Sequence, residues 1–277
     1  MPESFNMDFT QIATIAQKEF WDRIRNRWVL SVSIILVCFA AAISYLGTAQ
    51  QGSIGFTSLE VTIASLVSLA IYLIPLIALI LGYDAIVGEK ERGLLDLLLA
   101  LPITRAELLL GKYLGLSAAL AFTIIFGFGL VGLFLSYYVD IQGLLSYAGF
   151  VVSAVLMGMA FLSMALLLSV VTESKVVASG IAIALWFFFV LIYDMLLLGL
   201  LVASDGHLAN AIFGFLLMAN PADIFRIVNI LGMEDVKILY GLATVFPRSL
   251  ASTWILILCM VLWVIAPLVV AMWKFRQ

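Results

Sequence analysis

Six long apolar segments recur along the 277 residues, and each is long enough to cross a lipid bilayer as a helix. A transmembrane helix needs about 20 apolar residues. The chain is 65% hydrophobic and 11% charged, whereas soluble domains are about 45–50% apolar and about 25% charged. We therefore exclude a water-soluble globule and predict an all-α integral membrane protein with six transmembrane helices. The predicted spans are Trp28–Leu46, Val61–Tyr83, Tyr113–Tyr137, Leu144–Val171, Val176–Val202 and Ser252–Trp273.

The basic residues between these spans are distributed unevenly. Of the 14 Lys and Arg residues, all except Arg226, Lys237 and Arg248 fall on one side of the predicted topology. The short loops Gly47–Glu60 and Tyr138–Gly143 on the other side contain none. Because basic residues favour the cytoplasmic side of a membrane, this asymmetry predicts that both termini are cytoplasmic.

Residues 1–27 form the first of two predicted regions, and the six-span region 28–277 follows. Apolar residues in the first region recur at helical spacing, which indicates an amphipathic helix lying in the inner membrane interface. The alternative is a cytoplasmic helix packed on protein. The apolar positions are Phe9, Ile12, Ala16, Phe20 and Ile24.

The outer loop 203–251 is far longer than the other two outer loops. Residues 211–219 are apolar but too short to span, and residues 220–232 have apolar positions at helical spacing from about Pro221. We predict two short helices that dip into or lie on the outer leaflet, because irregular backbone must be covered by protein at that depth.

The inner loop 84–112 contains the stretch GEKERGLLDLLLALPITRAELLLGK, in which four consecutive charges precede a leucine-rich segment. The second span's helix is expected to continue past Asp84 as far as Arg92. Gly93 then permits a change of direction. Leu94–Leu101 is too short to span, and we predict a short helix or turn that stops before Pro102.

Thr104 and Glu107 have the spacing of a capping box, which predicts the start of the helix that becomes the third span. The product is a short apolar element at the inner membrane surface. Its leucines need cover, from either the membrane interface or the groove of a cytoplasmic partner. The alternative is a membrane-surface hairpin with a solvated run of charges.

Residues 83–115, YDAIVGEKERGLLDLLLALPITRAELLLGKYLG, resemble the inner loop of ABC-2 type transporter permeases, with the pattern E-x-E-R-G-x-L-x-x-L-L-x-x-P-[IV]-[ST]-R followed by GK. The six spans, the N-terminal helix and the outer helices match the plan of that family, which has a type V exporter-like fold. The resemblance implies a coupling helix that docks on an ATP-binding subunit. The implied coupling residues are Glu89, Glu91, Arg92, Leu94, Leu95, Leu98 and Arg105.

The phosphate-binding pattern GxxxxGK[ST] is missing, because Tyr113 follows Gly111-Lys112 and position 106 is Ala. The chain is therefore expected not to be an enzyme. The resemblance implies an ABC ATPase subunit in two copies, which would hold ATP and Mg, and a second copy of this chain. No cofactor or metal is expected on the chain itself: it has one histidine, His207, and its two cysteines, Cys38 and Cys259, form no CxxC pair. Nothing in the sequence suggests nucleic-acid binding.

The outer segment NPADIFRIVNILGMEDVKILYGLA, the pair Tyr193-Asp194 and the chain length resemble one branch of this family. Its members are the permeases of the transporter that assists copper-site assembly in nitrous oxide reductase. This implies the inner membrane of a bacterium and a periplasmic repeat protein on the outer loop, with Arg226, Asp223 and Phe225 as contacts. The cargo stays open between a sulfur species, mechanical action without cargo, and copper.

Two alternatives to this function remain: an ABC-2 exporter of a drug, peptide or lipid-like molecule, and a non-transporting membrane scaffold. Two carboxylates are candidate membrane-buried polar groups, Asp194 in the fifth span and Asp84 at the end of the second. A carboxylate at membrane depth costs about 2.5–3.5 kcal/mol. Asp194 should therefore face the bundle interior, the dimer interface or water, unless it reaches the outer interface.

Overall fold

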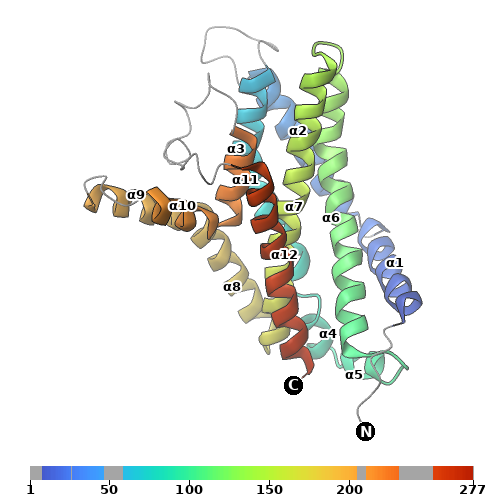
Figure 1. Cartoon of the computed structure of the whole chain (residues 1–277). Coiled ribbons are helices and arrows are strands. Elements are labelled where there is room, and N and C mark those ends of the chain that lie inside the picture. The colour runs from blue at the N-terminus through green and yellow to red at the C-terminus, as the bar shows by residue number, and fades with distance from the viewer. Residues whose placement is uncertain (1–7, 26, 47–58, 205–209, 231–251, 277) are drawn as a thin grey trace.

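The computed structural model describes residues 8–25, 27–46, 59–204, 210–230 and 252–276, and every regular element among them is helical (Figure 1). The all-α prediction is confirmed for these residues. The helices are α1 (Phe9–Arg25), α2 (Trp28–Leu46), α3 (Leu59–Gly82), α4 (Val87–Glu91), α5 (Leu94–Leu99), α6 (Arg105–Leu135), α7 (Ile141–Val171), α8 (Lys175–Phe187), α9 (Tyr193–Ala203), α10 (Asn210–Met218), α11 (Pro221–Ile230) and α12 (Thr253–Arg276), with a π-helical turn, Phe188–Ile192, joining α8 to α9.

Each predicted span coincides with a helix or with a continuous helical run. Five described runs are long and apolar enough to cross a membrane: Leu59–Glu91, Arg105–Leu135, Ile141–Val171, Lys175–Ala203 and Thr253–Arg276. Two bent pairs raise the number to seven if each is one span: α1 with α2, bent by 64°, and α10 with α11, bent by 107°. The count of six therefore stays a prediction within this range of five to seven.

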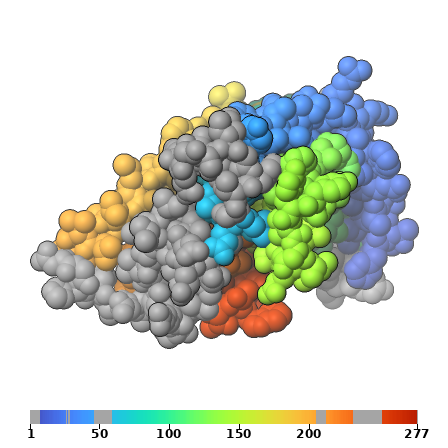
Figure 2. All heavy atoms as spheres, turned by 90° about the horizontal axis from the view of Figure 1, so that it is seen from above, coloured from blue at the N-terminus to red at the C-terminus, as the bar shows by residue number. Residues whose placement is uncertain are grey.

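α7 is the centre of the bundle, with α3, α6, α11 and α12 packed against it. Its most apolar window is 67% buried, whereas that of the run Lys175–Ala203 is 17% buried. α9 and α10 project sideways from the bundle, away from α1, in both views (Figures 1 and 2). We use "inner end" for the end of the bundle that carries α4 and α5, and "outer end" for the opposite one.

The second span's helix does not run unbroken to Arg92, so that prediction is wrong in its continuity. α3 ends at Gly82, a turn covers residues 83–86, and α4 follows. The Ser169 hydroxyl of α7 accepts hydrogen bonds from the amides of Ile86 and Val87, at 2.9 and 3.0 Å. These two amides would otherwise bond to carbonyls one turn back. A contact with another helix therefore interrupts α3.

The predicted change of direction at Gly93 is confirmed, since this residue has a left-handed φ of 67°. α5 follows directly. The capping box is also confirmed: the Thr104 hydroxyl accepts from the Glu107 amide at 3.2 Å, and the Glu107 carboxylate accepts from the Thr104 amide at 2.7 Å. The second oxygen of Glu107 accepts from the Asp8 amide at 2.8 Å, which ties the start of α1 to the start of α6.

α1 is a helix as predicted, and it packs against α6. The alternative of packing on protein is therefore the observed arrangement, while its depth relative to a membrane stays a prediction. The buried side chains of α1 are Ile12 and Glu19, and Phe9 is 80% exposed. The contact face is thus rotated from the predicted apolar stripe because a buried ion pair, described below, takes part in it.

The two short outer helices are confirmed as α10 and α11. α11 starts at Pro221 as predicted, and it packs against α3, α7 and α12, so it is built into the bundle. Most of the predicted outer loop 203–251 lies outside the described residues, which include only its parts 203–204 and 210–230.

Candidate functional site

The leucines of α5 form two sets at the inner end of the bundle. Leu95 is buried and Leu98 is half-buried, whereas Leu94, Leu97 and Leu101 are 42, 67 and 55% exposed. The exposed three recur at spacings of three and four residues, so they lie on one side of this element. Sequence reasoning named Leu94 but missed Leu97 and Leu101, although their helical spacing was a signal for both.

The charges before α5 are mostly used inside the chain. The Glu89 carboxylate lies 2.7 Å from the Lys112 ammonium, which also lies 3.3 Å from Glu19 of α1. The Glu91 carboxylate accepts a hydrogen bond of 2.6 Å from the backbone amide of Lys175, at the start of α8. Glu89 therefore joins α4 to α1 and α6, and Glu91 joins it to α8.

Arg92 and Arg105 differ in what they leave free. Arg92 is exposed and donates to the Gly88 carbonyl at 2.8 Å. Arg105 donates to the Phe275 carbonyl at 2.9 Å and lies 5.5 Å from the centre of that ring, which ties α6 to the end of α12. Among the predicted coupling residues, Glu91, Arg92, Leu94 and Arg105 are exposed, and Arg92 and Leu94 lack a contact to a distant helix among those described above.

The buried ion pair affects Glu19 itself. Burial raises the pKa of this carboxyl, but the nearby Lys112 ammonium and Arg23 guanidinium outweigh burial and hold the pKa below its ordinary value of 4.5. A carboxyl with a lowered pKa stabilises the folded state above its unfolded pKa, and this contribution is lost as the pH falls through the lowered value. The contact of α1 with α6 is therefore fully supported at neutral pH.

Asp84 lies in the turn between α3 and α4, at the inner end. Its carboxylate is 3.0 Å from the Lys175 ammonium and 4.0 Å from the Arg23 guanidinium. The predicted membrane-buried carboxylate is thus partly buried and paired with two cations. This pairing joins the turn to α1 and α8.

Asp194, the other predicted carboxylate, belongs to a polar cluster between α9 and α11. Its carboxylate is 2.9 Å from the Arg226 guanidinium, which is 2.7 Å from Asp223. The Asn220 amide donates to Asp223 at 3.0 Å and to the Phe189 carbonyl of the π-helical turn at 2.8 Å. Asp194 thus faces a basic partner inside the chain, which its sequence neighbours did not reveal.

The predicted outer contacts Arg226, Asp223 and Phe225 are largely enclosed. Asp223 is 1% exposed and Phe225 is 0% exposed, since both pack within the bundle. The Arg226 side chain is 17% exposed. Asp223 and Phe225 therefore offer no free surface to a partner in this arrangement, and the contact predicted for them has no support from the geometry.

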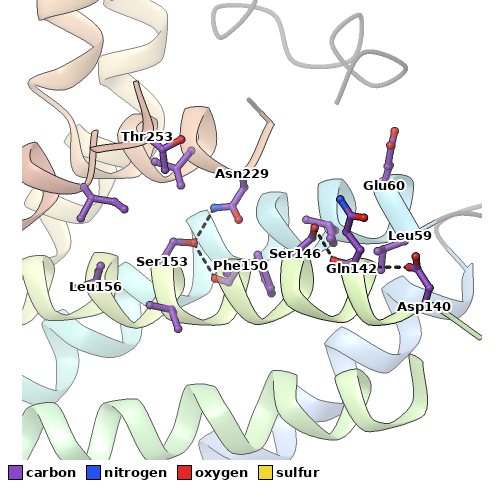
Figure 3. A pocket seen from close by; sticks show the side chains of 16 residues that line it. Leu59, Glu60, Asp140, Gln142, Ser146, Phe150, Ser153, Leu156, Asn229 and Thr253 are labelled. Carbon is purple, nitrogen blue, oxygen red and sulfur yellow. Dashed lines mark hydrogen bonds between the residues drawn. The ribbon is translucent and has the colours of Figure 1, made fainter. Parts of the chain in front are cut away.

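A pocket of about 770 Å³ opens at the outer end between α3, α7, α11 and α12 (Figure 3). Polar side chains from α7 and α11 meet there, and Ser153 and Asn229 are hydrogen-bonded across it. A second cavity, of about 480 Å³, lies at the inner end beside α5, between α1 and α6. Leu98, Leu101 and Leu108 line the second cavity together with the Lys112 ion pair.

A bundle of span-length apolar helices with these sites at its two ends defines a multi-pass membrane protein. Residues 13–277 match the family described as ABC-2 family transporter protein, and the chain belongs to that family. It is similar to the probable ABC transporter permease protein NosY of Stutzerimonas stutzeri, with 42% identity over 274 residues, covering 96% of this chain and 98% of the relative. The protein of the same name from Pseudomonas aeruginosa is 42% identical over 270 residues, covering 95% of this chain and 97% of the relative.

Proposed function

We propose that this chain is the permease subunit of an ABC transporter, and that α4 and α5 receive a separate ATPase subunit. The chain acts as a homodimer with two copies of that subunit, which bind ATP and Mg. Relatives named as permeases of ABC transporters over nearly the full length support the class. ABC-2 permeases generally pair with an ATPase subunit, and this chain lacks a phosphate-binding loop of its own.

The observation that carries the docking role is the exposure of Leu94, Leu97 and Leu101 on an element that is otherwise held firmly. Ion pairs and hydrogen bonds join α4 to α1, α6 and α8. A force applied to the exposed leucines therefore reaches three helices at once. Apolar side chains at the centre of an interface contribute most of its affinity.

The biological role that we propose is the maturation of the copper centres of nitrous oxide reductase, in the inner membrane of a bacterium with both termini in the cytoplasm. The resemblance of the outer segment 220–243 and the similarity to the two relatives named NosY support it. The transporter then exports a sulfur species or acts on a periplasmic partner protein. The alternative is export of a drug, peptide or lipid-like molecule.

The test is a variant that carries both Leu97→Asp and Leu101→Asp. We expect co-purification of the ATPase subunit to fall about tenfold or more, because each buried interface leucine is replaced by a charge. Copper in nitrous oxide reductase should fall with it, measured in a strain whose own permease is replaced by this chain. Val176→Asp, at an equally exposed apolar position on α8, is the matched control and should leave both quantities unchanged.

The two readouts separate the two parts of the proposal. Undiminished capture of the ATPase subunit by the double variant contradicts docking on α5. Lost capture with an unchanged copper content contradicts the copper role and favours export of another molecule.

A further inference from the structure

The outer pocket has an apolar floor and a polar wall, and its chemistry is independent of the coupling role at the inner end. Ile63, Phe150 and Leu156 supply apolar surface, and residues of α7 and α11 supply the polar groups. A volume of about 770 Å³ lies in the range of small-molecule sites, which run from about 300 to 1,000 Å³. Figure 3 shows the side chains that line it.

The two serine hydroxyls of the wall donate their protons to the chain itself. The Ser146 hydroxyl donates to the Gln142 carbonyl at 3.1 Å, and the Ser153 hydroxyl donates to the Phe150 carbonyl at 2.9 Å. A hydroxyl has a single proton to donate. In this arrangement both hydroxyls can offer only lone pairs to a ligand.

Asn229 is oriented by two hydrogen bonds. Its amide nitrogen donates to the Ser153 hydroxyl at 2.9 Å and to the Phe225 carbonyl at 2.8 Å. Because a backbone carbonyl can only accept, the second bond decides which end of the carboxamide is the nitrogen. The carboxamide oxygen therefore points away from these partners, on the side of Ser146 in Figure 3. This oxygen is an acceptor for a ligand.

The charges on the pocket have one sign. Glu60 and Asp140 line its rim, and no described lining residue is Lys, Arg or His. One oxygen of Asp140 accepts from the Gly143 amide at 3.0 Å, and the other stays available. Two carboxylates without a basic neighbour in the described lining attract cations and repel anions.

We propose that the outer pocket binds a primary ammonium group that carries an apolar body. Its N–H donors match the acceptors of Asn229, Glu60 and Asp140, and the apolar body covers Phe150 and Ile63. Such a ligand is either a soluble amine or the ethanolamine headgroup of a lipid, and both present the same ammonium. An anionic sulfur species has no partner of opposite charge in the described part of this pocket.

The test uses 2-phenylethylamine, a cation at pH 7, and 3-phenylpropionate, an anion of similar size. The protein is placed in nanodiscs of phosphatidylcholine, whose quaternary headgroup has no N–H to donate, and binding is measured by titration calorimetry against empty nanodiscs. We expect the amine to bind and the anion not to bind. Equal binding of the two compounds overturns the proposal.

A variant with Glu60→Gln and Asp140→Asn should bind the amine about tenfold more weakly or less, since both charges are lost. Asparagine retains the capping role of Asp140 at the start of α7. Glu173→Gln, an exposed carboxylate between α7 and α8, is the matched control and should bind as the unchanged protein does. Unchanged affinity in the double variant overturns the proposal.

The two sources of the ammonium are then distinguished with nanodiscs that contain phosphatidylethanolamine. Weaker apparent binding of 2-phenylethylamine there, in the unchanged protein alone, assigns the pocket to the lipid headgroup. Equal binding in both lipids assigns it to a soluble amine. Each of these results supports an ammonium site.

Discussion

At the scale of single residues, the charged side chains with the largest consequences are those paired inside the chain. Lys112 lies one turn or two inside α6 and is 4% exposed, with Glu19 and Glu89 as partners. Arg226 is similarly placed between Asp194 and Asp223. Removing one member of a buried pair leaves an uncompensated charge, which costs about 3–5 kcal/mol. These residues therefore decide stability before they decide function.

Lys112→Met should destabilise the protein by about 3–5 kcal/mol, because Glu19 and Glu89 then face each other without a cation. Unfolding in mixed detergent and denaturant measures the change, and hydrogen exchange locates it in α1. The control is Lys18→Met, whose ion pair with Asp22 is exposed and should cost less than about 1 kcal/mol. Equal costs for the two variants would show that Lys112 is not a buried link.

At the scale of elements, α1 is held on α6 by a close approach of the two helices. A Cβ added at Gly115 would lie 2.5 Å from the Ala16 carbonyl oxygen, and one added at Gly111 would lie 2.6 Å from the Ile15 Cβ. Small residues four apart allow such an approach between helices in membranes. The pair Gly111 and Gly115 therefore sets where α1 sits beside the coupling element.

Gly115→Ala and Gly129→Ala should change stability in opposite directions. A methyl group at Gly115 meets backbone and should cost about 1–3 kcal/mol despite the better helix propensity of alanine. At Gly129, in the same helix, the nearest atom is 4.0 Å away, so alanine should stabilise by up to about 1 kcal/mol. Thermal unfolding of the two variants measures the difference, and a stabilising Gly115→Ala would contradict the close approach.

At the scale of the whole molecule, α8 connects the inner site to the outer polar cluster. Its start is tied to the α3–α4 turn through Asp84 and Lys175, and the π-helical turn at its end is tied to Asn220. The run Lys175–Ala203 is only 17% buried in its apolar window, so few contacts hold it otherwise. π-Helical turns often mark functional positions in helices. We infer that α8 transmits movement from the ATPase side to the outer end.

Lys175→Met should weaken this transmission while the ATPase subunit still binds. Spin labels on Leu198→Cys and Trp254→Cys, in a chain with Cys38 and Cys259 replaced by alanine, report the distance between α9 and α12. We expect an ATP-dependent change in this distance that shrinks at least about twofold in the variant, since a partly buried ion pair is lost. Lys90→Met, an exposed lysine of α4, is the control.

An ATP-dependent change of equal size in the Lys175→Met variant would contradict the transmitting role of α8. It would leave the docking of the ATPase subunit on α5 untouched, because that is measured by capture alone.

The sequence by itself determined the features that depend on local chemistry. Apolar length predicted the helices, Gly93 and Pro221 predicted a turn and a helix start, and the Thr104–Glu107 spacing predicted a cap. The inner-loop pattern indicated the family. Each of these signals lies within a few neighbouring residues, where backbone geometry and bilayer thickness leave few alternatives.

Only the tertiary structure decided what the charged and polar side chains do. Ser169 interrupts α3 from 82 and 83 residues away in the chain, Lys112 meets Glu19 across 93 residues, and Arg226 meets Asp194 across 32. Nothing local specifies these pairs, because they depend on which helices become neighbours and how each is rotated about its axis. In a low-dielectric bundle such contacts are strong, so they decide which groups are enclosed and which remain for a partner.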